Sequence, residues 1–255
     1  MATTIFTPSM LRGAGTRGVP EVPVGSSFTN TYSMAFDGVD VGIDLGAGSA
    51  VGNGGITTVS FWIKGGVQTI PGANDLVLGG DYYNQWSFYE GHGANLIFRN
   101  INGVVFTLMT DVFDDNWHHI LMIRNPSGAN NTIRTYKDNG TPVNITLDWR
   151  YGSGGLYNGP LRYIGRSYAG LSGVDGNMDE VAVWNSELSS ADVATIYNSG
   201  TPGDLTSLSP QAWYRMGEEA TWDGSDWTLT DQGSSGTDGT STNMAEADRK
   251  SDVPS

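Results

Sequence analysis

The sequence predicts an all-β protein, a sandwich of two antiparallel sheets with one short helix near the C-terminal third. Short apolar runs alternate with clusters of Gly, Asn, Asp and Ser, and 36 of the 255 residues are glycine. About a dozen of these runs have the two-residue period of a strand, whereas a single segment has the period of a helix. A chain of this length can bury a large core as one β domain.

The strand candidates follow one another along most of the chain. In the run 57–64, Val59, Phe61 and Ile63 form one face, and Thr58, Ser60 and Trp62 form the other. The sequence Asp138-Asn139-Gly140 predicts a hairpin, because Asn-Gly is a strong signal for a tight turn. The full set of predicted strands is 32–36, 57–64, 76–78, 86–89, 96–99, 104–109, 117–124, 132–137, 143–147, 161–164, 178–184 and 212–216.

The last long strand candidate leads directly into the helix candidate. Its alternation predicts two faces, with Met178, Ala182 and Trp184 on one and Val181 and Val183 on the other. The pattern of about a dozen strands and one helix after this strand predicts two packed sheets.

The helix candidate has a clear beginning and end. Ser189 is a plausible N-cap with Asp192 three residues later. Val193, Ile196 and Tyr197 form its apolar face. Gly200 and Pro202 are expected to end it.

Composition excludes several classes of function. The net charge of −14 argues against nucleic-acid binding and against an anionic membrane surface, because both need a basic patch. The chain has no cysteine, so no disulfide holds the fold. We expect neither a secretory signal at the N-terminus nor membrane insertion, since no apolar run has the required length and flanks.

Six segments, taken together, resemble the concanavalin A-like jelly roll, specifically its laminin G-like branch. They occur in the family's order between about residues 30 and 200. The resemblance implies a two-sheet jelly-roll domain over 31–200. The segments are 36–40, 59–64, 117–120, 136–140, 161–165 and 176–200.

The flanking segments predict three regions in all. Residues 1–30 read as an extended N-terminal arm, and their composition equally suits a disordered tail. In the arm, Arg12 and Arg17 are the candidates for anchoring the chain to an acidic partner. Residues 201–255 contain pieces that resemble a segment usually found before such a domain. They either add a strand that completes the sandwich, which we favour because they are too short to fold alone, or begin a second unit. The same segment, 201–255, includes an acidic Gly/Ser-rich tail.

The segments 7–13 and 30–34, together with the ending from 242–245 through 252–254, are similar to virion proteins of marine bacteriophages. This resemblance implies a non-enzymatic virion structural protein, such as a capsid decoration, fibre or adhesin module. It also implies assembly in the host cytoplasm, location in the virion, contacts with other virion proteins and a homo-oligomer. The alternative is a free carbohydrate-binding lectin, with or without calcium dependence, and the third reading is a glycoside hydrolase.

Catalysis is disfavoured by the placement of the acidic residues. A retaining glycosidase needs two carboxylates about 5 to 5.5 Å apart. Asp179 and Glu180 are adjacent and are expected to face opposite sides of a strand, while Glu218 and Glu219 lie in a loop. The neighbours His118 and His119 are likewise expected on opposite faces, one of them inside, and not as joint metal ligands.

Calcium is the one metal that the resemblance implies. In relatives of this fold a structural Ca²⁺ often joins the first strand to the last, which would involve Asp37 and Asp179. Both residues have an alternative role. Asp37 comes before Gly38 and suits a turn, and the Asp179 carboxylate can accept a hydrogen bond from a backbone amide. Asp40 and Asp44 are weaker candidates.

Aromatic residues in two predicted loops are candidates for stacking against a sugar ring. The alternative is that they pack in cores or interfaces. The candidates for binding a cell-surface glycan are Tyr82, Tyr83, Trp86, Tyr151 and Tyr157.

Overall fold

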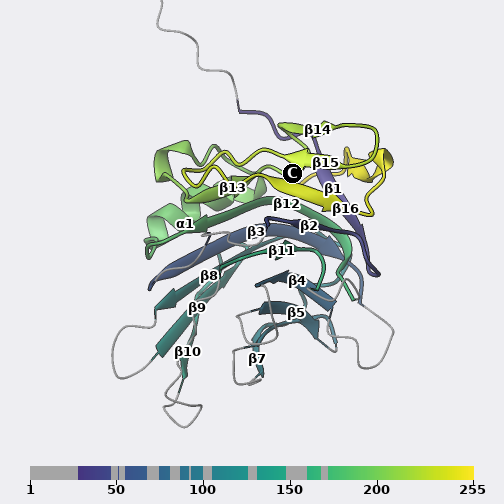
Figure 1. Cartoon of the computed structure of the whole chain (residues 1–255). Coiled ribbons are helices and arrows are strands. Elements are labelled where there is room, and N and C mark those ends of the chain that lie inside the picture. Colours follow the sequence, from purple (N-terminus) through teal and green to yellow (C-terminus); the bar gives the residue numbers. More distant parts are fainter. Residues whose placement is uncertain are drawn as a thin grey trace, which may run out of the picture.

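The computed structural model describes residues 28–46, 51, 55–67, 75–80, 87–91, 93–99, 105–125, 131–147, 160–167 and 172–255. Within these residues the protein is a sandwich of two antiparallel sheets with one short α-helix, which confirms the predicted fold class (Figure 1). In the same ranges, none of the helices is long and apolar enough to be a membrane span.

The first sheet contains eight strands among the described residues. They are β1 (Ser33–Asp37), β3 (Thr57–Gly65), β8 (His118–Asn125), β9 (Asn131–Lys137), β10 (Val143–Leu147), β12 (Asp175–Trp184), β13 (Ala212–Tyr214) and β17 (Arg249–Lys250). Their order is β10-β9-β8-β3-β12-β1-β17, and β13 pairs with the second half of β12.

The second sheet contains nine strands in the described part of the chain. They are β2 (Gly42–Asp44), β4 (Asp75–Gly79), β5 (Ser87–Gly91), β6 (Asn95–Arg99), β7 (Val105–Met109), β11 (Tyr163–Ile164), β14 (Ala220–Trp222), β15 (Trp227–Leu229) and β16 (Gly239–Thr242). Their order is β14-β15-β16-β2-β11-β4-β5-β6-β7.

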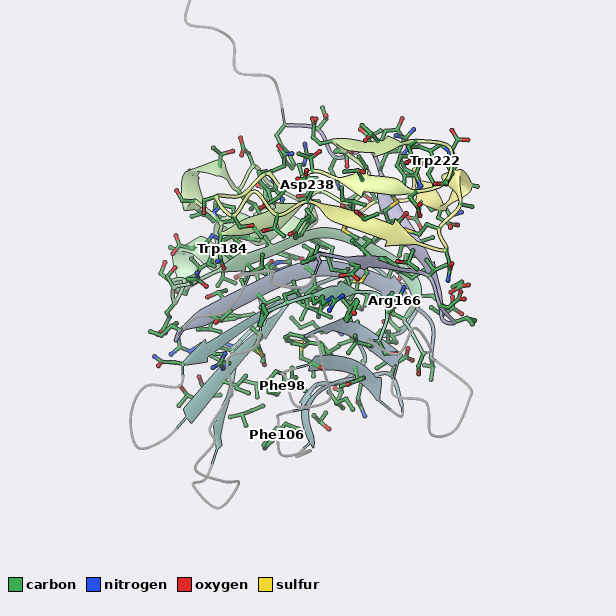
Figure 2. All side chains as sticks on the ribbon, in the orientation of Figure 1. Phe98, Phe106, Arg166, Trp184, Trp222 and Asp238 are labelled. Carbon is green, nitrogen blue, oxygen red and sulfur yellow. The ribbon has the colours of Figure 1, made fainter. Side chains whose placement is uncertain are left out.

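The main core fills the space between the sheets. Val59, Phe61 and Ile63 of β3 point into it and are fully buried, as the alternation of this run predicts. Phe98 of β6 joins them from the second sheet (Figure 2). The opposite face of the first sheet carries a second apolar cluster, which includes Trp184 and lies against the helix. Both faces of the first sheet are therefore covered.

The helix α1 (Ser190–Tyr197) begins as the sequence predicts. The Ser189 hydroxyl accepts from the backbone N–H of Asp192, and the Asp192 carboxylate accepts from the backbone N–H of Ser189. Val193 and Ile196 are buried against the first sheet. The helix ends at Asn198, which adopts the left-handed conformation with φ of 43°, rather than at Gly200.

The hairpin between β9 and β10 has its turn one residue earlier than Asn-Gly suggests. Asp138 and Asn139 have φ of 51° and 54°, so they are the two central residues of the turn. The Gly140 N–H donates to the Lys137 carbonyl over 2.8 Å and closes it. Asp and Asn both tolerate this left-handed conformation, which explains the shift.

The segment after Gly200 contributes strands to both sheets. It supplies β13 and β17 to the first sheet and β14, β15 and β16 to the second. Tyr214, Trp227 and Leu229 from this segment are buried in the main core. Figure 1 shows the segment, in green and yellow, packed along one side of the sandwich beside β1 and β12.

Candidate functional site

A β-bulge interrupts β12 at Asp179 and Glu180. Asp179 pairs with Trp62 and Ala182 pairs with Ser60, so β12 has one residue more than β3 between these pairs. Glu180 has φ of 47°, an unusual conformation for a residue other than glycine. The bulge therefore reverses the alternation of side chains along the strand.

The bulge corrects two predictions made from regular strand periodicity. Met178 lies in the main core with Val181 and Val183, not on the face of Ala182 and Trp184. The second prediction was that Asp179 and Glu180 face opposite sides of the strand, but the bulge brings their carboxylates together. Carboxylate oxygens of Asp179, Glu180 and Glu218 lie within 4.8 Å of one another. We call these three residues the acidic cluster.

The acidic cluster holds the segment that precedes β1. Asn30 Nδ2 donates to Asp179 Oδ2 over 2.8 Å. The backbone N–H groups of Thr31 and Tyr32 both donate to Glu218 Oε1, the second over 2.8 Å. Glu218 comes from the turn between β13 and β14, so the cluster joins three distant parts of the chain.

Glu180 has its own partners on the outer face of the first sheet. Arg215 Nε donates to Glu180 Oε1 over 3.1 Å, and Trp213 Nε1 donates to Glu180 Oε2. The Arg215 guanidinium also lies 4.2 Å from the centre of the Phe28 ring. Arg215 thus forms an ion pair with one of the three carboxylates of the acidic cluster.

Burial dominates the electrostatics of the acidic cluster. Asp179 and Glu180 are 0% and 3% exposed. Burial, together with the nearby Glu180 carboxylate, raises the pKa of Asp179 well above its usual range. Burial also raises the pKa of Glu180 to about 7, against the opposing charge of Arg215. These two carboxylates are buried and are not accessible to a substrate.

The acidic cluster fits the calcium ion that the family resemblance implies. Asn30 Oδ1 and Glu218 Oε2 are buried oxygens without a hydrogen-bond partner among the described residues. Calcium prefers carboxylate and amide oxygens, and it would supply the positive charge that three clustered carboxylates lack. The residues that would hold it are Asn30, Asp179, Glu180 and Glu218.

Asp37, the other predicted calcium ligand, lies elsewhere. Its strand partner is Asp175, four residues before Asp179, which corresponds to about 13 Å along the strand. Its Oδ1 accepts from the backbone N–H groups of Val39 and Asp40 over 2.9 and 3.3 Å. Asp37 therefore has the alternative role, that of a turn residue.

The two weaker calcium candidates do not join the acidic cluster either. Asp44 is paired with Arg162, whose Nε lies 3.0 Å from Asp44 Oδ1. Asp40 lies in the turn after β1, where its backbone N–H donates to Asp37.

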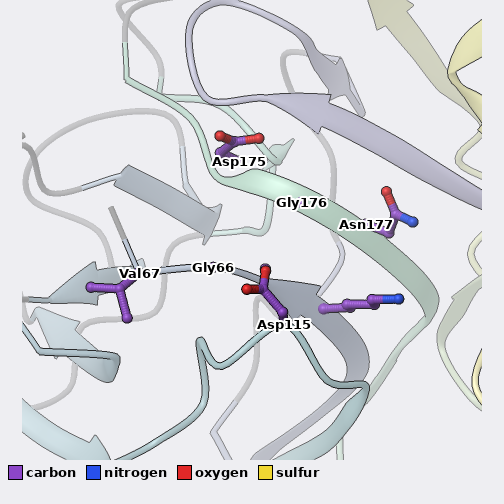
Figure 3. Close-up of a pocket in the computed structure, with 8 residues that line it drawn as sticks. Gly66, Val67, Asp115, Asp175, Gly176 and Asn177 are labelled. Carbon is purple, nitrogen blue, oxygen red and sulfur yellow. The ribbon is translucent and has the colours of Figure 1, made fainter. Parts of the chain in front are cut away.

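A pocket of about 350 Å³ opens where β3 ends and β12 begins (Figure 3). We call it the Lys64 pocket. Asp175 and Asn177 lie on β12, and Asp115 lies on the facing loop before β8. Val67, one of the few large apolar side chains exposed among the described residues, is 50% exposed here. The lining residues are Lys64, Gly65, Gly66, Val67, Asp115, Asp175, Gly176 and Asn177.

Glycines allow the walls of the Lys64 pocket to approach each other. A Cβ at Gly176 would lie 2.2 Å from the Lys64 carbonyl oxygen, and one at Gly66 would lie 2.9 Å from Asp115 Oδ1. The Asp115 N–H donates to the Gly65 carbonyl over 2.9 Å and fixes the loop to the end of β3. The sequence showed no sign of this pocket, since its residues come from three separate segments.

The C-terminal segment reaches the edge of the Lys64 pocket through Asp252. Lys64 Nζ donates to Asp252 Oδ2 over 2.7 Å, and Trp117 Nε1 donates to Oδ1 over 3.1 Å. Asn177 Nδ2 lies 3.5 Å from Oδ2. The hydrogen bond from Lys64 is the main reason that the pKa of Asp252 is lowered.

His118 and His119 lie on opposite faces of β8, as predicted, and do not form a metal site together. His118 contacts Asp138 Oδ2 through Nδ1 at 2.7 Å. His119 is fully buried beneath the helix, with Nε2 2.8 Å from the Ser60 hydroxyl oxygen. Burial lowers the pKa of His119 to about 4, so it is neutral.

The remaining predicted site residues lie outside the described residues. These are the glycan candidates Tyr82, Tyr83, Trp86, Tyr151 and Tyr157, and the anchoring candidates Arg12 and Arg17.

Comparison with known proteins identifies the family. A family model described as the concanavalin A-like lectin/glucanases superfamily matches residues 37–194, well over half of the chain. The chain belongs to this superfamily. A search of curated protein sequences returns no match. The superfamily includes both lectins and enzymes by name, so membership establishes the fold and leaves the activity open.

Solved structures agree with the family assignment. A suspected carbohydrate-binding protein from Bacteroides ovatus ATCC 8483 is 15% identical with a TM-score of 0.61, over 89% of this chain and 62% of that protein. The extracellular region of zebrafish Gpr126/Adgrg6 is 11% identical with a TM-score of 0.53, over 88% of this chain and 26% of that protein. This chain thus spans less than two thirds of either protein, and at these identities the likeness shows the fold alone.

Proposed function

We propose that this superfamily member is a carbohydrate-binding module and that it binds a glycan in the Lys64 pocket. The pocket itself is the observation that carries the proposal. Sugar hydroxyls both donate and accept hydrogen bonds. Asp115 and Asp175 offer acceptors, and Val67 offers an apolar surface for the C–H face of a ring. Asn177 offers donors, as do the N–H groups of Lys64 that Asp252 does not accept. The pocket's volume is within the usual range for small-ligand sites.

Two further observations support this function over catalysis. The buried carboxylates of the acidic cluster do not line the Lys64 pocket. The Bacteroides ovatus protein with the same fold is itself a suspected carbohydrate-binding protein. A module that binds glycans also suits an adhesin on a virion, so the phage role expected from the sequence stays a prediction compatible with this one.

A glycan array followed by calorimetry tests the proposal. Asp115→Asn should weaken binding of the glycan identified by at least about tenfold, because a carboxylate accepting two hydroxyls is lost. Asp111→Asn is the matched control, since Asp111 is also exposed and also has a positive φ, of 56° against 66° for Asp115. Absence of binding on the array, or equal losses in the two variants, would contradict the proposal.

We propose in addition that the acidic cluster holds a structural calcium ion. The two partnerless oxygens, Asn30 Oδ1 and Glu218 Oε2, support this reading. The ion would neutralise the buried carboxylates and fasten the segment before β1 to β12 and to the turn after β13.

A further inference from the structure

The Lys64 pocket carries an excess of negative charge. Its lining includes one cation, Lys64, and two carboxylates, Asp115 and Asp175. Both carboxylates are exposed, and neither forms an ion pair within the part of the chain that the structure describes. They are therefore available to a ligand.

Lys64 is not available in the same way. Its ammonium group lies 2.7 Å from Asp252 Oδ2, and Trp117 and Asn177 hold the same carboxylate in place. The Ser33 hydroxyl donates to the Asp252 carbonyl over 2.7 Å and fixes the backbone at this residue. Asp252 does not itself line the pocket, but it neutralises the single cation among the lining residues.

We propose that Asp252 sets the charge selectivity of the Lys64 pocket, which binds sugars with a free ammonium group in preference to sugars with a carboxylate. The inference rests on the proposed glycan-binding function and names its ligand class. With Asp252 counted, two negative charges remain unbalanced around the pocket. An amino sugar brings the opposite charge, whereas a uronic acid brings a third negative charge to a site whose lysine is occupied.

The expected preference is modest because the pocket is open to water. Each exposed charge pair contributes little to the free energy of binding, and this corresponds to about a two- to fivefold difference in affinity per pair. Two carboxylates acting on one ammonium group should give about a tenfold preference at low salt. Added salt should reduce that preference, since the charges are screened.

The experiment compares matched oligosaccharides on the whole chain. An array carries the same sugar backbones in neutral, N-acetylated, free-amino and uronate forms at about pH 6, where an amine is protonated. The free-amino form should bind most tightly and the uronate form most weakly. Equal binding of free-amino and N-acetylated forms at low salt, or tighter binding of the uronate form, would overturn the inference.

The variant Asp252→Asn tests the role of Asp252 itself. Asparagine keeps the shape and can still accept from Trp117, but the positive charge of Lys64 is no longer balanced by a carboxylate. The amino-sugar preference should fall about two- to fivefold, and uronate binding should rise by a similar factor. Glu246→Gln, an exposed change of the same charge in the same segment, should leave both affinities unchanged. An unchanged preference in Asp252→Asn would contradict the inference.

The two proposals fail in different ways. Absence of binding in every form contradicts the glycan-binding function. Binding without charge preference contradicts the selectivity alone and leaves the function standing.

Discussion

Arg215 and Glu180 form a buried ion pair on the outer face of the first sheet. Arg215 Nε and Glu180 Oε1 are 3.1 Å apart, and the two side chains are 12% and 3% exposed. Because the Glu180 carboxylate is buried, removal of Arg215 leaves it without a compensating charge.

We expect Arg215→Met to reduce the free energy of unfolding by about 3–5 kcal/mol, as is typical when a buried pair loses one partner. Urea denaturation monitored by tryptophan fluorescence measures this free energy. Arg134→Met is the control, because Arg134 and Glu187 form an ion pair whose side chains are 40% and 36% exposed. That change should cost less than about 1 kcal/mol. Similar losses in both variants would contradict a larger contribution to stability from the Arg215–Glu180 pair than from the Arg134–Glu187 pair.

Calcium should stabilise the fold through Glu218. At a calcium concentration about 100 times the dissociation constant, binding to the folded state adds about 2.7 kcal/mol to the free energy of unfolding. Calorimetry with calcium chloride or with a chelator measures the shift in melting temperature, expected to be about 5–10 °C for a chain of this size.

The variant Glu218→Gln should abolish the calcium-dependent shift, because the partnerless Oε2 is lost as a ligand. Glu219→Gln is the matched control, since Glu219 is the next residue, is exposed and does not belong to the acidic cluster. The calcium proposal does not survive if melting temperatures agree with and without the ion.

His119 should make the fold sensitive to acid. Its pKa is about 4 in the folded protein because of burial, and about 6.5 when unfolded. The unfolded state therefore takes up a proton first, so this contribution to stability is complete above pH 6.5 and is lost as the pH falls toward 4. The loss is about 3 kcal/mol.

Urea denaturation between pH 7 and pH 4 measures this dependence. His119→Gln should flatten the decline, and the difference between the two proteins isolates His119 from the other titrating groups. The pKa of His118 is raised, mainly by Asp138, so it has the opposite sign and stabilises the fold as the pH falls. Parallel curves for wild type and variant would contradict the role of His119.

Local patterns were sufficient to predict most elements of the fold. The alternation in β3 correctly placed Val59, Phe61 and Ile63 in the core. Ser189 and Asp192 correctly marked the start of α1. These signals succeed because a strand face and a helix cap depend on residues a few positions apart.

Local patterns failed where one residue departed from the regular backbone. The conformation of Glu180 moved Met178 to the other face and brought the Asp179 and Glu180 carboxylates together. A strand template assumes exact alternation, and only pairing with β3 shows that β12 holds one residue too many.

The sequence by itself determined the all-β fold class, twelve of the seventeen strands found in the described residues, the start of the helix and the family. Tertiary structure alone decided which polar groups meet: Glu218 with Asp179 in the acidic cluster, and Asp252 with Lys64 beside the pocket. These partners are far apart in the chain, and their approach depends on sheet pairing and on the path of the C-terminal segment. Periodicity reports the conformation of a short segment, whereas a binding site depends on where distant segments are brought together.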